Sequence, residues 1–504
     1  MKFYLTTPIY YVNDIPHIGH AYTTIAADVL SRWHKMCGYD VFFLTGTDEH
    51  GLKIVESAKN KNIPVKQYCD EISGHFKQSW KLLNISYDGF IRTTDDKHIT
   101  AVSVFIHKLH ENNKIYKKKY TGLYCISCER FLTETELIDG KCPDHKIAPV
   151  THEEENYFFK LSEYRDTLIN IISDSSHPQH IDILPESRKN EILGKLKLGL
   201  DDISISREHL PWGIPLPFDK SQTLYVWIDA LLNYITAIEY GTDSWSNQKL
   251  WPADLHLMAK DILWFHSVIW PAMLLAAGLP VPGKLFAHGF FTVNGQKMSK
   301  TIGNVIQPEQ LIERFGVDAT RYLLLSAFPF GTDGDISMEL MTEKYNSNLA
   351  NNIGNLVSRT VTMVEKYCSG RIPGKPGNNN ILLEKCSVEF KDIPGYYKSL
   401  EFSKIIDSIQ RSVNQANNYV GEKEPWNLAK HDKHDELNEV LYNLCEFIWV
   451  LAHYLYPIMP EISNSILQQI GEINKAENTK YFSGSRIPSL KSNTVAKTIL
   501  FPRK

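Results

Sequence analysis

The sequence predicts an α/β fold built on a parallel sheet and followed by an all-helical C-terminal region. Three observations lead to this prediction. Short apolar runs at 2–7 and 41–44 alternate with stretches of helical periodicity. This alternation of strands and helices is typical of a parallel sheet with helices on its faces. Between 116 and 150 the periodicity breaks and a different module begins. From about Ser337 onward the pattern becomes helical.

Length and composition limit the class of protein. A chain of 504 residues is too long for one ordinary core, so we expect two or three domains. The content of 43% hydrophobic and 22% charged residues is typical of a soluble globular protein. The net charge of −4 argues against coating by nucleic acid but leaves a local basic patch open. The eight cysteines are thinly spread, which indicates a reducing compartment, and we expect a cytoplasmic protein.

No membrane segment is predicted. Residues 1–12 lack the apolar core of a signal peptide. The most apolar window, 268–281, is interrupted by two prolines and is too short to span a bilayer.

The first strand, at 2–7, is expected to end at Pro8, and the next helix to run from Ala21 to Met36. Between them, Pro16-His17-Ile18-Gly19-His20 lies on a strand-to-helix turn, where backbone N–H groups and the helix dipole favour an anion. Gly19 allows a ligand to approach the backbone closely, and His17 and His20 could donate hydrogen bonds to phosphate oxygens. The alternative is that both histidines serve capping and packing.

The second strand, at 41–44, leads into the polar segment 45–51 and then a helix from Leu52 to Asn60. Ligands of parallel sheets bind beyond the carboxyl ends of the strands, where this segment and the histidine turn both lie. Asp48 could hold a substrate ammonium there. The alternative is that Asp48 or Glu49 caps the next helix.

The module after residue 116 carries two C-x2-[CH] pairs, Cys125 with Cys128 and Cys142 with His145. Two tight turns bearing thiolate or imidazole ligands suit tetrahedral zinc in a structural role. His152 is a less favoured fourth ligand because it falls outside the second turn. Free structural cysteines are the alternative.

Aromatic and polar residues recur at helical spacing further along the chain. One face carries Trp227, Ala230 and Tyr234, and a second carries Ile262, His266 and Trp270. Aromatic faces at this spacing more often belong to a core than to a pocket, so the pattern by itself favours a core.

Another strand, 285–291, contains His288-Gly289, and a loop with Lys297 and Lys300 follows it. Ammonium groups opposite the histidine turn could neutralise a triphosphate and the charge that develops as pyrophosphate leaves. A plain basic surface loop is the alternative.

The pair His17-Ile18-Gly19-His20 and Lys297-Met298-Ser299-Lys300 resembles the signature of class I aminoacyl-tRNA synthetases. The surrounding motifs narrow the resemblance to the methionyl-tRNA synthetase family, of the type with one zinc knuckle and no C-terminal dimerisation domain. These motifs are 7–11, 45–51, the cysteine module and Trp227-Ile228-Asp229-Ala230. The resemblance extends over nearly the whole chain.

The resemblance implies specific roles for the residues of the site. The methionine-binding set would be Ile9, Tyr11, Asp48, Trp227, Ala230, Tyr234, Ile262, His266 and Trp270, with Asp48 on the α-ammonium. Tyr11 and His266 could offer weak hydrogen bonds to the sulfur. The ATP-binding set would be His17, Gly19, His20, Asp261, His288, Gly289, Lys297 and Lys300. Catalysis would rest on His17, His20, Lys297 and Lys300, with Mg²⁺ accompanying ATP.

Two positions depart from the family pattern. Thr301 stands where the family usually has Ser, and Ala259 stands where Gly is common, so the ribose loop could differ slightly.

The resemblance also implies a division of the chain. A Rossmann-type catalytic domain would comprise 1–115 and 225–325. A connective insertion would occupy 116–224, with its zinc knuckle at 116–150. A stem-contact linker at 326–345 would lead to an all-α anticodon-binding bundle at 346–504.

The start of that bundle is predicted as one long helix with two different faces. The buried stripe would be Leu349, Ile353, Leu356, Val357, Thr360 and Met363, and the exposed face Asn348, Asn351, Asn352, Asn355 and Arg359. Asparagine is a poor helix former, so exposed amides at this density suggest RNA reading. The resemblance assigns the anticodon to Asn351, Asn355, Arg359 and Trp426. An ordinary solvated face is the alternative.

The expected function is ATP-dependent activation of L-methionine and its transfer to the 2′-OH of the terminal adenosine of tRNA(Met), by a monomer. One alternative is a class I synthetase for leucine, isoleucine, valine or cysteine, although 116–223 is too short for an editing insertion. An apolar pocket discriminates one methylene by about 1–3 kcal/mol, so size alone does not identify the amino acid. The second alternative is a nonenzymatic RNA-binding protein on a degenerate nucleotide-binding fold.

Overall fold

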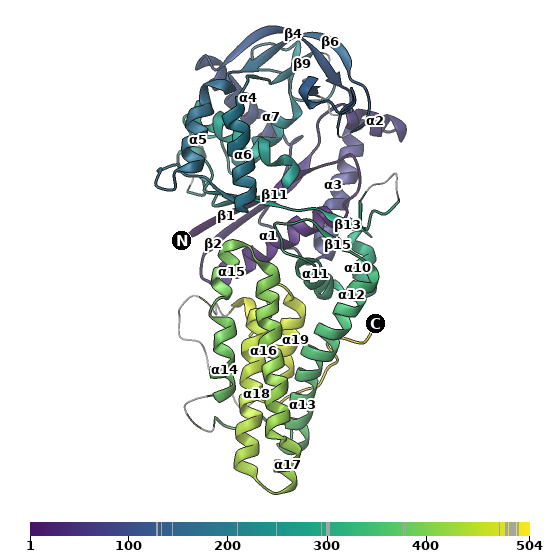
Figure 1. The fold of residues 1–504 in the computed structure, drawn as a ribbon, viewed down its shortest axis with the longest axis vertical. Helices are drawn as coiled ribbons and strands as arrows, with labels where there is room; N and C mark the ends of the chain where they lie inside the picture. Colours follow the sequence, from purple (N-terminus) through teal and green to yellow (C-terminus); the bar gives the residue numbers. More distant parts are fainter. Residues whose placement is uncertain are drawn as a thin grey trace.

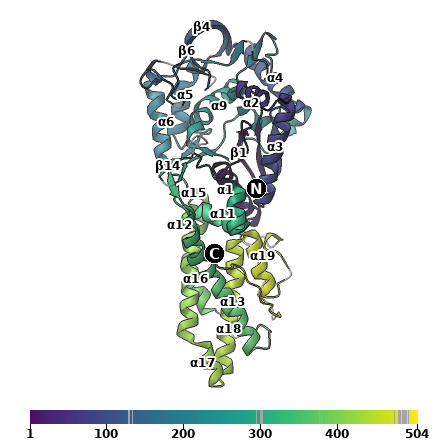
Figure 2. The same cartoon turned by 90° about the vertical axis from the view of Figure 1, so that its right-hand side faces the viewer.

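The computed structural model places an α/β part and a helical bundle at opposite ends of an elongated molecule (Figure 1). The strands β4 and β6 lie at one end, and the helix α17 lies at the tip of the other in both views (Figure 2). The structure describes residues 1–127, 130–132, 134–143, 145–208, 210–247, 249–293, 295–298, 303–375, 377, 380–472, 474–478, 482, 490 and 493–504.

The α/β part is built on six parallel strands in the order β3-β2-β1-β11-β12-β7. Consecutive side chains of a strand point to opposite faces, so the sheet separates two cores. Leu5 and Phe286 belong to the core that contains helix α1, while Tyr4 and Leu285 belong to the other. The strand bounds are β1 (Lys2–Tyr11), β2 (Asp40–Asp48), β3 (Gly89–Arg92), β7 (Asp182–Leu184), β11 (Leu255–Ala259) and β12 (Lys284–His288).

The prediction that Pro8 ends the first strand is wrong. The strand β1 continues to Tyr11, and its pairing with β2 shifts register between Thr6 and Ile9. Such an irregularity tolerates a proline, which has no N–H to donate to the ladder. The result carries Ile9 and Tyr11 out to the carboxyl edge of the sheet.

Helices cover both faces of the sheet and connect its strands (Figure 1). Helix α2 has the bounds that periodicity predicts. The helices of this part are α1 (Ile18–Met36), α2 (Leu52–Asn60), α3 (Val65–Leu82), α4 (Asp96–Glu111), α5 (Arg165–Ser173), α6 (Glu186–Leu198), α7 (Val226–Leu231), α8 (Asn233–Thr236), α9 (Trp270–Ala276), α10 (Pro308–Phe315) and α11 (Val317–Ser326).

The inserted module is mostly antiparallel. Its strands run in the order β5-β4-β6-β8, beside a short hairpin of β9 and β10. The segment also returns to the main sheet, because β7 pairs with β12 at the sheet edge. The bounds are β4 (Ile115–Cys125), β5 (Arg130–Leu132), β6 (Val150–Phe159), β8 (Ile203–Ser204), β9 (Ser206–Glu208) and β10 (Gln222–Leu224).

A small three-stranded sheet connects the two ends of the molecule. It has the order β14-β13-β15. Its members are β13 (Phe291–Val293), β14 (Gln296–Lys297) and β15 (Gly334–Ile336), so the lysine segment and the residues leading into the bundle share one sheet.

The bundle begins with a continuous helical segment whose predicted stripe is buried: Leu349, Ile353, Leu356, Val357 and Thr360 are inaccessible, and Met363 nearly so. The segment is not a uniform α-helix, because its middle, η6 (Tyr345–Gly354), is a π-helix. The helices of the bundle are α12 (Met338–Lys344), α13 (Asn355–Tyr367), α14 (Ile381–Phe390), α15 (Ile393–Ser399), α16 (Phe402–Lys423), α17 (Pro425–Lys430), α18 (His434–Leu455) and α19 (Pro460–Gln469).

A buried charge cluster joins the two parts of the molecule. Asp28 on α1 accepts hydrogen bonds from Arg32 Nε (2.7 Å) and from Arg321 Nη2 (2.6 Å) on α11. Arg321 is fully buried and also donates to the carbonyls of Pro457 (3.0 Å) and Ile458 (2.8 Å), which follow α18. The same guanidinium therefore anchors the first helix of the sheet and the end of the bundle.

Among the described residues, no helix combines the length and the apolar character needed to cross a membrane.

Candidate active site

Two adjoining cavities open at the carboxyl ends of β1, β2, β11 and β12. The smaller has a volume of about 210 Å³ and the larger about 530 Å³. Residues that line both are Pro8, Ile9, Tyr11, Trp227 and Ile262. The two cavities therefore lie next to each other, and a group bound in one is close to a group bound in the other.

The histidine turn forms one wall of the larger cavity. His17 is the N-cap of α1, and its Nδ1 accepts from the Gly19 N–H (3.0 Å). His20 Nδ1 accepts from the His17 N–H (3.3 Å), and the two rings stack with centroids 3.8 Å apart. Because each Nδ1 is an acceptor, the neutral form of each ring carries its proton on Nε2. Both histidines therefore do cap the helix, as the alternative states. The same hydrogen bonds fix the orientation of both rings.

A side chain at position 19 would force the His17 ring to shift. A Cβ at this position would lie 2.9 Å from His17 Cε1 and 3.8 Å from Met298 Cε. Met298 belongs to the lysine segment, and the Ile18 N–H donates to the Ile306 carbonyl (3.0 Å) just beyond it. The described part of the lysine segment thus lies directly against the histidine turn.

The lysines themselves are described only in part. Lys297 is the last residue of β14, with backbone pairing to Thr292, and its side chain lies outside the described residues. Lys300 and Thr301 also lie outside them.

The opposite side of the larger cavity is formed by the ends of β11 and β12. Asp261 is exposed in the short turn after β11, and Ala259 before it has φ −78°, which any residue adopts, so alanine fits there without strain. His288 Nδ1 donates to the Gly289 carbonyl (2.7 Å), and its Nε2 accepts from the Thr23 hydroxyl (2.6 Å). Burial lowers the pKa of His288 to about 4, so the ring is neutral. A Cβ on Gly289 would lie 2.0 Å from the Thr332 carbonyl oxygen.

The smaller cavity is largely apolar, with Asp48 at its edge. Its lining includes Ile9, Tyr11, Asp48, Trp227, Ala230, Tyr234, Ile262 and His266 from the predicted set. Asp48 is the last residue of β2 and is 9% exposed. The alternative role as a helix cap is excluded, since the N-cap of α2 is Gly51 and the Glu49 carboxylate accepts from Arg92 (2.6 and 2.9 Å).

Trp270 lies one layer deeper than the predicted pocket. Its ring is fully buried, with its centroid 6.0 Å from that of Tyr234 and 6.0 Å from that of Trp251. Its Nε1 donates to His256 Nε2 (3.4 Å). It supports the wall formed by Tyr234.

The expectation that His266 offers a hydrogen bond to a sulfur is wrong. His266 Nδ1 donates to the Ile262 carbonyl (2.9 Å), so Nε2 accepts from the Tyr234 hydroxyl (2.7 Å). Burial lowers the pKa of His266 to about 4 and raises that of Tyr234. Both groups are neutral, and the histidine orients the tyrosine ring. The second predicted face is also irregular, because Phe265–Ile269 is a π-helix.

Two polar residues in the lining of the smaller cavity were not anticipated. Lys53 lies in the first turn of α2, five positions after Asp48, and no periodicity relates the two. Asn233 donates to the Ala230 carbonyl (2.6 Å) and is buried in the lining. Its spacing of three from Ala230 is a helical one, so a stricter count of that face would have included it.

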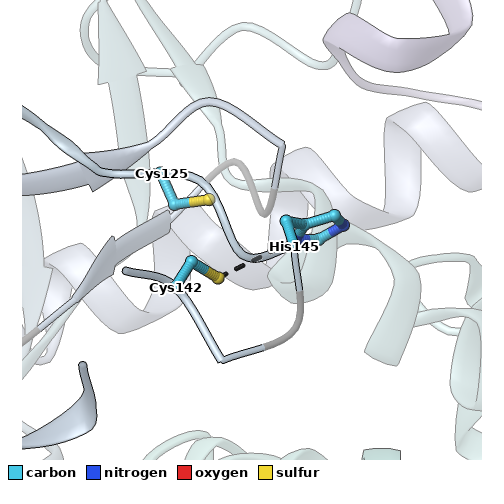
Figure 3. A group of neighbouring side chains, drawn as sticks. All are labelled: Cys125, Cys142 and His145. Carbon is cyan, nitrogen blue, oxygen red and sulfur yellow. Dashed lines mark hydrogen bonds between the residues drawn. The ribbon is translucent and has the colours of Figure 1, made fainter. Parts of the chain in front are cut away.

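A group of metal-type ligands lies in the inserted module (Figure 3). The ligand atoms of Cys125, Cys142 and His145 all lie within 4.8 Å of one another, and Cys142 Sγ is 3.8 Å from His145 Nδ1. Both cysteines are buried although the module is small. Two thiols and an imidazole at this separation suit a metal of the zinc type. Cys128 and the side chain of His152 lie outside the described residues.

The predicted asparagine face divides into two groups. Asn352 faces inward and bonds to Gln410 (2.8 Å) and Asn414 (2.8 Å) on α16, and Asn348 donates to the Tyr322 hydroxyl (3.1 Å). Those two amides were wrongly placed on the exposed face, because they satisfy the polar groups of neighbouring helices.

The other group faces solvent. Asn351 and Asn355 are exposed, and Asn351 accepts from Arg503 (2.9 Å). The Arg359 guanidinium lies 6.0 Å from the Trp426 ring centroid, and Trp426 is 41% exposed although it is a large aromatic residue. Trp426 belongs to α17, which lies at the tip of the bundle (Figure 1), and Arg359 lies beside its ring. Asn351 lies beside Arg503, next to the C-terminus of the chain.

Comparison with known sequences gives consistent matches. The family model described as "tRNA synthetases class I (M)" matches residues 3–149 and 135–361. A methionine–tRNA ligase of Clostridium acetobutylicum is 47% identical over 509 residues, covering 100% of this chain and 78% of that protein. A methionine–tRNA ligase of a Nostoc species is 44% identical over 489 residues, covering 95% of this chain and 91% of that protein.

Solved structures of methionyl-tRNA synthetases are also similar to this chain. The Mycobacterium tuberculosis methionyl-tRNA synthetase in complex with methionyl-adenylate superimposes with a TM-score of 0.93 at 38% identity, covering 100% of both chains. The free-state structure of the Mycobacterium tuberculosis protein gives a TM-score of 0.86 at 35% identity, covering 100% of this chain and 98% of that one.

Proposed function

This chain belongs to the methionyl-tRNA synthetase family, and from that premise we propose how its residues share the work of methionine activation. It is a methionine–tRNA ligase, which forms methionyl-adenylate from L-methionine and ATP and transfers the methionyl group to tRNA(Met). The observation that carries the residue assignment is the pair of adjoining cavities with a shared wall.

The smaller cavity binds methionine. Its apolar wall of Ile9, Trp227 and Tyr234 takes the thioether side chain, since aromatic faces interact well with a polarizable sulfur. Asp48 at the cavity edge holds the α-ammonium. This orientation directs the carboxylate across the shared wall into the larger cavity.

The larger cavity binds ATP. His17 and His20 direct Nε2–H donors at phosphate oxygens, and the dipole of α1 favours negative charge at its N-terminus. Gly19 admits the phosphates, Asp261 holds the ribose, and His288-Gly289 borders the adenosine. Lys297 and Lys300 complete the phosphate site, supported by the contact of Met298 with the histidine turn. ATP brings Mg²⁺ with it as part of the substrate.

No side chain acts as a nucleophile in this scheme. The methionine carboxylate attacks the α-phosphate, a bond forms to phosphorus, and pyrophosphate leaves. The 2′-hydroxyl of the terminal adenosine then takes the methionyl group and AMP leaves. His17, His20, Lys297 and Lys300 contribute by positioning and by stabilising the charge that develops on the phosphates.

The cysteine module holds one structural zinc. Cys125, Cys142 and His145 supply three ligands, and Cys128 is the fourth that the spacing provides. The donor set is chemically that of a structural zinc site. Zinc would cross-link the end of β4 to the turn at 142–145, and it takes no part in the reaction.

The bundle binds the anticodon. Asn351, Asn355 and Arg359 offer hydrogen bonds to base edges, and the half-exposed Trp426 ring offers a stacking surface. We assign 1–115 and 225–325 to catalysis, 116–224 to the connective insertion except for β7, which belongs to the catalytic sheet, 326–345 to contact with the tRNA stem and 346–504 to the anticodon.

A monomer is the assembly that we propose, because one chain supplies both cavities and the exposed tip of the bundle. Since its product is a charged tRNA for translation, we place the protein in the cytoplasm. Light scattering coupled to size-exclusion chromatography tests the first assignment, with a mass twice that of the chain as the contrary result.

The test of the function is amino-acid-dependent ATP–pyrophosphate exchange, run separately with each standard amino acid and Mg²⁺. Exchange with methionine alone is expected. Exchange with leucine, isoleucine, valine or cysteine would keep the chemistry and overturn the assignment of the smaller cavity. Absence of exchange from folded, zinc-loaded protein would favour a nonenzymatic RNA-binding role.

A further inference from the structure

Behind the smaller cavity lies a chain of buried hydrogen bonds centred on Asp229. Its carboxylate is 1% exposed, and each of its oxygens has a partner. Oδ2 is 2.6 Å from His50 Nδ1, and Oδ1 is 2.7 Å from His98 Nε2. The other nitrogen of His98, Nδ1, is 2.7 Å from the Thr236 hydroxyl. The four side chains form one continuous series, His50–Asp229–His98–Thr236, which we call the Asp229 chain.

The chemistry of the Asp229 chain determines its protonation. Burial by itself would raise the pKa of Asp229, but His50 and His98 hold it near 2, so the carboxylate is ionised. An ionised carboxylate is an acceptor, so His50 Nδ1 and His98 Nε2 must both carry a proton and donate it. Because both oxygens accept from imidazoles, the Asp229 side chain has one fixed orientation.

The Asp229 chain joins the elements that form the two sides of the smaller cavity. Asp229 lies on α7 beside the lining residue Ala230, and Thr236 ends α8 two positions after Tyr234. His50 lies two positions after Asp48, on the other side of the cavity. His98 reaches them from α4. None of the four side chains lines the cavity itself among the described lining residues.

The helices α7 and α8, which carry the wall of the smaller cavity, are too short to be stable by themselves. Helix α7 has 6 residues and α8 has 4. Helices this short are unstable in isolation, so tertiary contacts decide where their side chains lie. The charge-assisted bonds of Asp229 are among the strongest contacts of this kind.

We propose that Asp229 is a positioning residue for methionine activation, which through His50 and His98 sets the separation between Asp48 and the aromatic wall of Trp227 and Tyr234. This rests on the proposed function of the smaller cavity as the methionine site. The separation determines the length of the amino acid that fits between an ammonium-binding carboxylate and an apolar end. Asp229 itself touches no substrate in this scheme.

The experiment compares Asp229→Asn with wild-type protein in methionine-dependent ATP–pyrophosphate exchange. Asparagine has the same shape, but its NH₂ group would face an imidazole N–H. We expect the KM for methionine to rise about tenfold while the KM for ATP changes by less than about twofold, because Asp48 and Tyr234 line the smaller cavity and not the larger one, whereas Trp227 lines both. Thr236→Val, which removes the last hydroxyl of the series, should raise the methionine KM less, and Thr236→Ser should restore it.

The matched control is Asp28→Asn. Asp28 is as deeply buried and has several hydrogen-bond partners, but it lies at the junction of α1 with the bundle. We expect this control to lower the melting temperature without changing the methionine KM by more than about twofold.

The outcomes distinguish the positioning role of Asp229 from the assignment of the methionine site. A methionine-specific rise of KM in Asp229→Asn and Thr236→Val, with rescue by Thr236→Ser, supports the positioning role. Loss of melting temperature with an unchanged methionine KM in Asp229→Asn overturns it, although the methionine site stands. If wild-type protein exchanges with a different amino acid, the methionine site falls and the positioning role falls with it.

Discussion

Arg321→Met tests whether the buried charge cluster holds the sheet and the bundle together. Arg321 is fully buried and donates to the Asp28 carboxylate (2.6 Å) and to the carbonyls of Leu83 (3.1 Å), Pro457 (3.0 Å) and Ile458 (2.8 Å). Methionine fills much of the same space but donates nothing. The carboxylate then faces a single arginine, and several buried carbonyl groups lose a donor.

The expected cost follows from these lost partners. Removing one member of a buried ion pair destabilises a protein by about 3–5 kcal/mol, because the remaining charge is left uncompensated. For a cooperatively folding domain of a few hundred residues, this loss of unfolding free energy should lower the melting temperature by about 10 °C. The loss should be largest near neutral pH. Burial would raise the pKa of Asp28, but Arg32 and Arg321 lower it below its usual range. The stability that depends on its charge is therefore present above about pH 4 and is lost as the pH falls further.

The assay is thermal unfolding followed by circular dichroism, with hydrogen exchange of the segment 455–470 as a local readout. The control is Arg314→Met, because Arg314 is exposed and donates to Thr342 (3.0 Å). Its substitution should change stability by less than about 0.5 kcal/mol. The double variant Asp28→Asn, Arg321→Met should be more stable than the sum of the single effects predicts. If Arg321→Met unfolds at the same temperature as Arg314→Met, the cluster does not hold the two parts together.

Four further predictions concern the site, the metal, the RNA and pH. His20→Ala should reduce the rate of adenylate formation by about 10²-fold, measured by pyrophosphate exchange, with little change in methionine affinity. Cys142→Ser should abolish bound zinc, measured by elemental analysis, and lower the melting temperature. Trp426→Ala should reduce kcat/KM for tRNA aminoacylation by about tenfold, since stacking on one base is worth about 1–3 kcal/mol. Burial holds the pKa of His266 and of His288 near 4, so each ring stays neutral in the fold and gains a proton first in the unfolded chain. The melting temperature should therefore fall as the pH drops from about 6.5 to about 4.

Controls distinguish these predictions from general loss of structure. Equal losses of methionine affinity and of adenylate formation in His20→Ala would contradict its role at the phosphates. Full zinc content in Cys142→Ser would exclude Cys142 as a ligand. Trp426→Ala should leave pyrophosphate exchange unchanged, and a loss there would place its effect in folding. A melting temperature that is constant between pH 6.5 and pH 4 would mean that the buried histidines are charged in the fold.

Several features could be predicted from the sequence because they depend on neighbours in the chain. The histidine turn is defined by Gly19 and by two capping side chains within four residues. The buried stripe that begins at Leu349 follows from helical periodicity, and the metal group from two short Cys/His spacings. In each case the local chemistry leaves few alternatives.

Other features depend on contacts between distant parts of the chain, which no local pattern records. The strand β1 passes through Pro8 because its neighbours accommodate a shift in register. Asn352 turns inward because Gln410 and Asn414 lie opposite it on another helix. Met298 meets Gly19 across nearly 280 positions of the sequence.

The same distinction applies within the site. Trp227, Ala230 and His266 could be named from family resemblance, but their spacing by itself favoured a core, whereas the structure places them in the lining of the smaller cavity. The hydrogen bond that commits His266 to Tyr234, and the bonds that join Asp229 to two histidines from other elements, exist only in the folded chain. The sequence by itself determined which chemical groups are present and which short turns present them. The tertiary structure decided their partners, because hydrogen bonding and burial act between groups that are close in space, whatever their separation along the chain.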